Sequence, residues 1–86
     1  MAWFVYVLQC HNDELYTGVT TRLERRLQEH QCGEGGKFTR TFRPVELIYT
    51  EHSSTEHEAK RREVQLKGWS RRKKLALIEQ RSSIAP

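Results

Sequence analysis

LYTGVTTRLERRLQEH, residues 15–30, predicts a strand, a turn and a helix in succession. On the predicted helix, Leu23, Arg26, Leu27 and His30 follow the i, i+3, i+4, i+7 spacing of one face. Two of these four positions carry a guanidinium and an imidazole where apolar side chains belong. A cation on an inward face is costly unless an anion meets it. We therefore infer that the anion comes from outside, as a substrate.

Length and charge narrow the class of protein. A chain of 86 residues has room for one small core, so we expect a single domain over residues 1–80 and a frayed tail over residues 81–86. Charged residues make up 30% and hydrophobic residues 36%, which is typical of a globular domain and not of a disordered chain. The net charge of +4 favours a polyanionic partner such as nucleic acid.

The sequence contains neither a run long enough to span a membrane nor a basic N-terminal leader, so we expect a cytoplasmic protein with no membrane partner. Cys10 and Cys32 are then expected to be free thiols. Cys10-His11 and His30-x-Cys32 could also be drawn as a zinc site. Neither half has a common ligand spacing, and we prefer two unremarkable small residues at the ends of elements.

The first two strands are predicted to form a hairpin. Residues 3–9 are a continuous run of apolar and aromatic strand formers, and residues 15–20 are the second strand. A loop of residues 11–13 sets Cys10 opposite Glu14 and Tyr6 opposite Gly18. Tyr6 and Tyr16 then share a face, whereas a loop one residue longer would put them on opposite faces.

Capping signals divide the rest of the chain. The pattern Thr21-x-x-Glu24 predicts a first helix from near Arg22 to about Gln31. A third strand follows over residues 45–50, and its alternation places Val45, Leu47 and Tyr49 on one face.

Two further helices are predicted after this strand. The pattern Thr55-x-x-Glu58 starts a helix that runs to about Lys67 and stops at Gly68. Ser70 can cap a last helix from Arg71 to about Gln80. Leu75, Ile78 and Leu77 are the side chains expected to dock it. The order β-β-α-β-α-α predicts an α+β domain, with a three-stranded, mainly antiparallel sheet flanked by helices.

The second helix carries an inward carboxylate. Ala59, Arg62, Glu63 and Leu66 share one face, so Glu63 is directed at the sheet. One interpretation is a buried ion pair with Arg26 or Arg62. The other is a magnesium ion held by one carboxylate, waters and phosphate oxygens.

Each of these polar residues has a structural explanation of its own. Tyr6 and Tyr16 could be core tyrosines with satisfied hydroxyls, Gly18 could mark a bulge, and His30 could favour the helix dipole. Their joint order is more specific. It resembles the GIY-YIG nuclease family over about residues 3–80, in the form of its small standalone bacterial members. Phe4-Val5-Tyr6 stands where the family has Gly-Ile-Tyr, and Tyr16-Thr17-Gly18 where it has Tyr-Ile-Gly.

Arg26, His30 and Glu63 match the arginine and histidine of the family's first helix and its metal-binding glutamate. The family's first glycine is Phe4 here, and Gly68-Trp69-Ser70 occupies the region where many members carry an asparagine. The resemblance implies an endonuclease that hydrolyses phosphodiester bonds, with DNA as the expected substrate. Branched, single-stranded or damaged DNA and RNA stay open.

The resemblance also implies roles. Arg26 would neutralise phosphoryl charge, and Mg²⁺ or Mn²⁺ on Glu63 would stabilise the leaving oxygen. Tyr6 would be the general base, with its pKa lowered by Arg26 and the metal. Tyr16 and His30 would orient the water or relay its proton, and Lys67 would contact phosphate.

Two basic segments are candidates for contacts to the nucleic-acid backbone. The first is Arg71, Arg72 and Lys73, which with Lys74 form the densest basic run, although a solvated helix start explains the run equally well. The second comprises Lys37, Arg40 and Arg43.

Two rival hypotheses follow from the same residues. One is a nucleic-acid-binding module of this fold with little or no turnover. The other is an interaction protein whose inward polar residues form only a structural ion-pair network. For a nuclease this small, a protein partner could supply specificity, and the oligomeric state is left open.

Overall fold

The computed structural model describes residues 2–10, 14–32 and 44–84. Its elements follow one another in the predicted order: β1 (Trp3–Cys10), β2 (Leu15–Thr20), α1 (Leu23–Gln31), β3 (Pro44–Ser53), α3 (Glu56–Lys67) and α4 (Arg71–Ile84). This order and the antiparallel sheet confirm the predicted α+β class. None of the described helices is long and apolar enough to cross a membrane.

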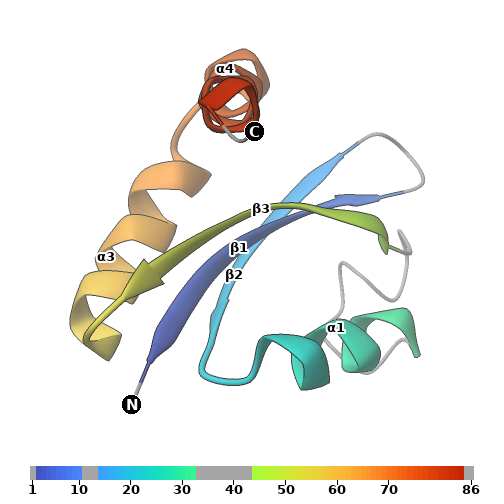
Figure 1. Ribbon diagram of the computed structural model, residues 1–86, viewed down its shortest axis with the longest axis vertical. Coiled ribbons are helices and arrows are strands. Elements are labelled where there is room, and N and C mark those ends of the chain that lie inside the picture. The colour runs from blue at the N-terminus through green and yellow to red at the C-terminus, as the bar shows by residue number, and fades with distance from the viewer. Residues whose placement is uncertain (1, 11–13, 33–43, 85–86) are drawn as a thin grey trace.

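The sheet has the strand order β2-β1-β3, with both neighbours antiparallel to β1. Helix α1 lies on one side of the sheet, α3 lies on the other, and α4 follows α3 at the far end (Figure 1). Residues 5–8 in the centre of β1 are all buried. A strand that is covered on both faces needs apolar side chains of both parities, which explains the unbroken apolar run at the start of the chain.

The hairpin register is the predicted one. Tyr6 pairs with Gly18, and the backbone N–H of Cys10 donates to the carbonyl of Glu14 over 3.0 Å. Paired residues in an antiparallel ladder share a face, and so do residues two apart along a strand. Tyr6 and Tyr16 therefore lie on the same face, which is the face that α1 covers.

The pairing of β1 with β3 corrects one prediction. Val7 pairs with Tyr49 while Leu8 pairs with Leu47, so the register shifts between these two pairs. Val7 and Leu8 point to opposite faces of β1, and their partners do the same. The predicted single face for Leu47 and Tyr49 is therefore wrong, because an extra residue in β3 breaks the alternation.

The start of α1 differs from the predicted capping box at Thr21. The N-cap residue is Arg22, and no side chain caps it. The hydroxyl of Thr20 instead accepts a hydrogen bond from the Arg22 backbone N–H at 3.0 Å. This hydrogen bond forms a local turn at the end of β2, and α1 begins after it, at Leu23.

The other helix boundaries follow the predicted signals. The Thr55 hydroxyl accepts from the Glu58 backbone N–H at 3.2 Å, and α3 ends at Lys67 before Gly68. The Ser70 hydroxyl accepts from the Lys73 backbone N–H at 3.2 Å and caps α4. Helix α4 continues past its predicted end near Gln80 to Ile84, because no glycine or proline occurs before Pro86.

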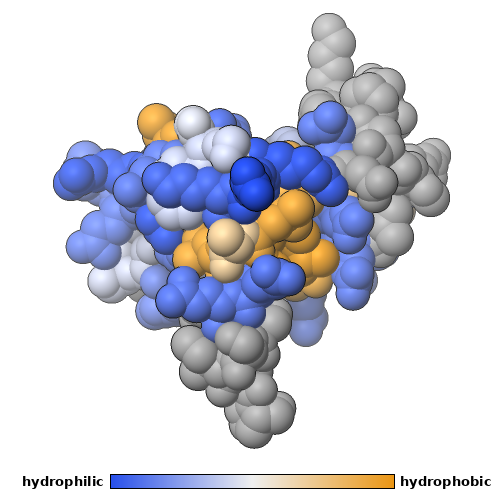
Figure 2. Space-filling model, turned by 90° about the horizontal axis from the view of Figure 1, so that it is seen from above, coloured by the Kyte–Doolittle hydropathy of each residue, from blue (hydrophilic) through white to orange (hydrophobic). Residues whose placement is uncertain are grey.

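One apolar core joins α3 and α4 to the sheet. Its buried centre is Val5, Ala59 and Leu66, and the partly buried side chains packed against it are Trp3, Val19, Trp69 and Leu77. Leu75, expected to dock α4, is instead 36% exposed. From the side on which α4 lies, a small apolar area is framed by hydrophilic side chains (Figure 2). Leu77 is thus the residue that anchors α4 to this core.

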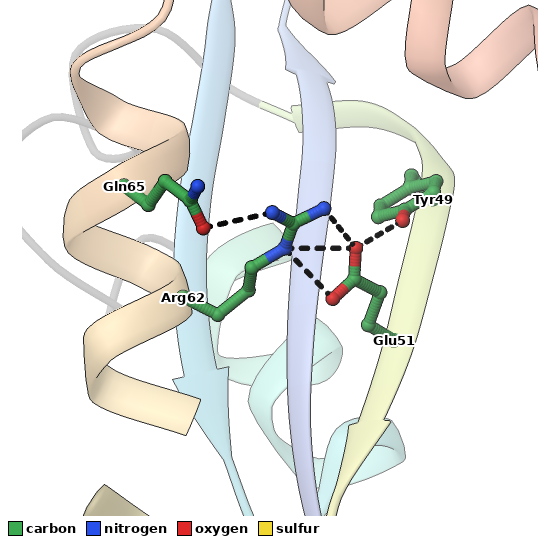
Figure 3. Close-up of polar contacts among 4 residues, drawn as sticks. All are labelled: Tyr49, Glu51, Arg62 and Gln65. Atoms are coloured by element: carbon green, nitrogen blue, oxygen red, sulfur yellow. Dashed lines mark hydrogen bonds and ion pairs between the residues drawn. The ribbon is translucent and has the colours of Figure 1, made fainter. Parts of the chain in front are cut away.

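A polar network ties α3 to β3. Arg62 reaches from α3 to the carboxylate of Glu51, with Nε 3.0 Å from Oε1 and Nη2 2.9 Å from Oε2 (Figure 3). The Tyr49 hydroxyl donates to the same carboxylate, and Arg62 Nη1 donates to Gln65 Oε1 at 2.8 Å. The guanidinium also lies 5.2 Å from the ring of Trp69. The hydrogen bonds to Glu51 raise the pKa of Arg62, so they favour its charged form.

Replacing Glu51 with alanine should lower the free energy of unfolding by about 1.5–3 kcal/mol, because it leaves a partly buried guanidinium without its anion. Urea denaturation followed by circular dichroism measures this. Lys60→Ala is the matched control, since Lys60 forms an exposed pair with Glu56 at 3.4 Å and should cost less than about 0.5 kcal/mol. Equal losses in the two variants would show that the network contributes no more than an ordinary surface pair.

Candidate active site

The centre of the candidate site is a hydrogen bond between two residues 24 positions apart. The Tyr6 hydroxyl lies 2.8 Å from Nε2 of His30. Both side chains are buried, with 1% of Tyr6 and 0% of His30 exposed. Tyr6 comes from the central strand and His30 from the last turn of α1, so the bond fixes α1 against the sheet.

Tyr16 completes a cluster of three rings. Its centroid lies 5.0 Å from that of His30 and 6.3 Å from that of Tyr6, with tilted and edge-on geometries. Such offset arrangements are the favourable ones for aromatic pairs. Tyr16 is half-buried, so it is the ring through which the cluster meets solvent.

Gly18 makes room for Tyr6. A Cβ atom at position 18 would lie 2.5 Å from the Tyr6 hydroxyl oxygen and 2.6 Å from Cζ. The strand therefore needs glycine here because the Tyr6 ring lies directly over the β2 backbone. This close approach is the physical reason for the second glycine of the motif.

Both partners of the central bond are held neutral. Burial raises the pKa of Tyr6, and Tyr16 and Glu63 raise it further, while Arg26 lowers it. Arg26 thus acts on the pKa of Tyr6 in the predicted direction, but burial outweighs it and the pKa is raised; the predicted effect of a metal ion stays a prediction. Burial and Arg26 together lower the pKa of His30. At neutral pH a phenol thus faces a neutral imidazole, and we assign the phenol as the donor and Nε2 as the acceptor.

Arg26 lies at the rim of this cluster. Its side chain is 38% exposed, and Nη1 is 3.6 Å from Oε1 of Glu29. Its influence on the pKa of both Tyr6 and His30 places its charge close to the central bond. Arg26 was predicted to point inward, and its side chain is in fact partly exposed to solvent.

Glu63 has a different partner from those predicted. Its carboxylate is 20% exposed and lies 3.4 Å from Nζ of Lys67, one turn along α3. The predicted ion pair with Arg26 or Arg62 is wrong, because Arg62 is taken by Glu51. The charge of Glu63 nevertheless acts on Tyr6. Glu63, on α3, thus influences the ring cluster through its charge, and its ion-pair partner is Lys67.

Among the described residues, Glu63 is the predicted metal ligand, and it has to be tested whether its surroundings suit a metal ion. Among residues 2–10, 14–32 and 44–84, no three His, Cys, Asp or Glu side chains come together. This opposes the zinc site: within the described chain, buried Cys10 and exposed Cys32 form no such cluster with His30, and His11 lies outside the described residues. One carboxylate suits Mg²⁺, which keeps several waters and takes further oxygens from a phosphate.

The basic run of α4 divides between two environments. Nζ of Lys73 lies 4.4 Å from the ring of Trp69, the ring that Arg62 also approaches. Burial lowers the pKa of Lys74, and the charge of Lys67 lowers it further. Arg71 and Arg72 are exposed at the start of α4, and Lys37, Arg40 and Arg43 lie outside the described residues.

A pocket at the start of α1 holds two arginines that the sequence did not single out. It has a volume of about 240 Å³ and is lined by Thr20, Thr21, Arg22, Arg25, Arg26 and Glu29. The spacing of Arg22, Arg25 and Arg26 at i, i+3 and i+4 was the available signal, since it places three guanidiniums on neighbouring positions of one helix.

Comparison with known proteins agrees with this geometry. A family model described as the GIY-YIG catalytic domain matches residues 2–76, and the chain therefore belongs to the GIY-YIG family. The resemblance drawn from Tyr6, Tyr16, Gly18 and the helix-borne residues is confirmed at the level of the family.

The relatives define a narrower group. A UPF0213 protein of Staphylococcus haemolyticus is 47% identical over 78 residues, which cover 91% of this chain and 95% of the relative. One from Natronomonas pharaonis is 49% identical over 75 residues, covering 87% of this chain and 88% of the relative. The solution structure of a UPF0213 protein from Bacillus halodurans matches with a TM-score of 0.60 at 40% identity, over 93% of this chain and 85% of that one.

Gly18→Ala should destabilise the protein by about 1–3 kcal/mol, because the new methyl group overlaps a Tyr6 ring that is buried and hydrogen-bonded. Gly68→Ala is the control. Its Cβ would meet only carbonyl oxygens at 3.5 and 3.7 Å, and φ is −78°, so alanine there should be neutral or slightly stabilising. Thermal denaturation of both variants decides the matter. A Gly18→Ala protein as stable as Gly68→Ala would contradict the placement of Tyr6.

The lowered pKa of His30 predicts an acid-sensitive fold. Below the ordinary histidine pKa of about 6.5, the unfolded chain binds a proton that the folded His30 resists. Stability should therefore fall as the pH drops from about 7 to about 5. His30→Gln should show a shallower dependence in denaturant titrations, whereas His57→Gln, which removes an exposed imidazole, should keep the wild-type slope. Identical slopes for wild type and His30→Gln would contradict a neutral, buried His30.

Proposed function

We propose that this protein is a metal-dependent endonuclease that hydrolyses phosphodiester bonds of nucleic acid, with DNA as the first substrate to test. The observation that carries the proposal is the buried Tyr6–His30 hydrogen bond, with a cation, Arg26, and a carboxylate, Glu63, both acting on Tyr6. Family membership supports the nuclease class.

Proton removal is the step for which the ring cluster is suited. A neutral phenol is a poor base, but Tyr6 already points its proton at Nε2 of His30. As the attacking water gives its proton to the Tyr6 oxygen, Tyr6 passes its own proton to His30. The hydroxide attacks phosphorus and the P–O bond to the leaving oxygen breaks. His30 is left as an imidazolium, and the alkoxide that leaves takes a proton from solvent. Because Tyr6 is 1% exposed, a neighbouring side chain has to move before water reaches its hydroxyl.

Charge neutralisation falls to Arg26 and Lys67. Arg26 presents a guanidinium, whose fork matches phosphate oxygens, at the edge of the cluster. A bound phosphate would compete with Glu29 for Arg26, since that pair is partly exposed and 3.6 Å long. Lys67 would exchange its contact with Glu63 for a phosphate oxygen.

Glu63 is the residue that would hold Mg²⁺ or Mn²⁺. A divalent ion there supplies Lewis-acid stabilisation of the leaving oxygen. The release of Lys67 toward phosphate would free the Glu63 carboxylate for this role. The exposed Arg71 and Arg72 would contact the backbone of the nucleic acid further out. Lys73, Lys37 and Arg40 are proposed to make contacts of the same kind. We also propose that the protein works in the cytoplasm and that a protein partner supplies its specificity.

One observation favours a second candidate, a nucleic-acid-binding module without turnover. Tyr6 is buried and Glu63 is already paired with Lys67. If neither side chain were released by substrate, the basic surface would bind nucleic acid and the rings would serve only the fold.

Glu63→Gln should reduce cleavage by about 100-fold or more while largely preserving binding, because it removes the charge proposed to hold the metal. The assay is cleavage of a panel of labelled duplex, branched and single-stranded DNA and of RNA, with Mg²⁺, with Mn²⁺ and with chelator. Glu58→Gln, an exposed carboxylate on the same helix, is the matched control and should cut like wild type.

Binding without metal-dependent cutting across the whole panel would support the binding module and overturn the nuclease. Cutting that survives Glu63→Gln would leave a nuclease but remove Glu63 from its proposed role.

A further inference from the structure

The pocket at the start of α1 is lined by three arginines, of which Arg22 and Arg25 are exposed, and by a single glutamate. Arg22, Arg25 and Arg26 line it with Glu29, and its volume is about 240 Å³. Glu29 pairs with Arg26 at 3.6 Å. Within the part of the chain that the structure describes, no carboxylate lies in ion-pair contact with Arg22 or Arg25. Like charges gathered around one hollow repel one another, so the arrangement favours an anion inside it.

The pocket is continuous with the candidate active site through Arg26. This side chain lines the pocket and also acts on Tyr6 and His30. Arg22 precedes it by one helical turn, which is about 6 Å along the helix axis. An anion in the pocket would thus sit next to the group that Arg26 holds at the ring cluster. The pocket would therefore bind a second anion beside the one at the ring cluster.

The chain holds Arg22 firmly at the pocket wall. The Thr20 hydroxyl accepts from the Arg22 N–H at 3.0 Å and approaches its carbonyl at 3.4 Å. Thr20 is buried at the end of β2, so the backbone of Arg22 is fixed to the sheet. The long side chain of Arg22 then has a defined origin beside Arg25 and Arg26, which reduces the entropy lost on binding.

We propose that Arg22 and Arg25 form a phosphate subsite that binds the backbone phosphate adjacent to the cleaved one on the same strand. This inference rests on the proposed function and adds to it the way the strand is held in register. Two phosphates on one strand would be bound by the N-cap residue and the first turn of α1, with Arg26 shared between them. The guanidinium forks suit phosphate oxygens, and backbone contacts of this kind position a strand without reading its sequence.

The test is fluorescence anisotropy with a labelled oligonucleotide in chelator, so that binding is measured without cleavage. The double variant R22Q/R25Q removes both charges and keeps a polar side chain of similar helix propensity at each position. We expect binding at least about tenfold weaker at low salt. The slope of log affinity against log salt should fall by about 0.9 for each lost phosphate contact on duplex DNA, or about 0.7 on a single strand.

The matched control is K60Q/R61Q, which removes the same charge from the exposed face of α3 across the sheet. It should change the affinity less than twofold. Equal weakening by both double variants would show that only net charge matters and would overturn the subsite. Retention of wild-type affinity and salt slope by R22Q/R25Q would do the same. A second arm restores charge with R22K/R25K, which should recover most of the affinity, and circular dichroism confirms that each variant is folded.

The failure of this inference can be told apart from failure of the proposed function. If wild type binds and cuts nucleic acid but R22Q/R25Q binds as tightly, only the subsite is overturned. If wild type binds no oligonucleotide in the panel, the proposed function fails and the subsite fails with it.

A competition experiment with inorganic phosphate distinguishes a backbone subsite from a general anion site. If added phosphate weakens oligonucleotide binding equally in wild type and R22Q/R25Q, the result supports the backbone subsite. If it weakens binding by wild type but not by R22Q/R25Q, the pocket is a general anion site and the backbone subsite is overturned.

Discussion

The hydrogen bond between Tyr6 and His30 is the constraint on which the rest of the site depends. It joins the central strand to the last turn of α1 across 24 residues, and both side chains are buried. An unsatisfied hydroxyl or imidazole in this position would cost about 1–3 kcal/mol, so neither residue can be moved alone. The bond requires the hairpin register that pairs Tyr6 with Gly18, the missing Cβ at Gly18, and a helix long enough to bring His30 over the ring. The same bond fixes where Arg26 lies, one turn earlier on α1.

Much of this arrangement follows from local rules. The hairpin register predicted from the sequence is the observed one, and it puts Tyr6 and Tyr16 on a common face. Thr55, Ser70 and Gly68 marked helix boundaries that the structure reproduces. Three predictions failed for reasons that lie outside local sequence. Thr21 caps no helix while Thr20 accepts from the Arg22 N–H, a register shift in β3 separates Leu47 from Tyr49, and Leu75 stays 36% exposed while Leu77 packs against the core. Each of these three outcomes depends on contacts that form only in the folded protein.

The inward polar residues divide into two groups that the helical pattern alone does not separate. Arg62 and Glu63 are adjacent on α3, yet Arg62 reaches across to Glu51 on β3 (Figure 3) while the charge of Glu63 acts on Tyr6. Arg62 therefore stabilises the packing of α3, and this leaves Glu63 available beside Lys67. The helical pattern placed both side chains toward the sheet, but Arg62 pairs with Glu51 of β3 whereas Glu63 pairs with Lys67 of its own helix. The α1 arginine pocket was missed for a related reason: three arginines on a helix become a pocket only when the end of β2 closes one side.

The protonation of His30 tests the account most directly. Nitrogen-15 NMR of the histidine side chains at neutral pH reports which ring nitrogen carries the proton. The account predicts a neutral His30 protonated on Nδ1, with an unprotonated Nε2 that accepts from Tyr6 and shifts in Tyr6→Phe. A proton on Nε2, or an imidazolium at neutral pH, would contradict it, because His30 could then not receive the proton that Tyr6 must give up.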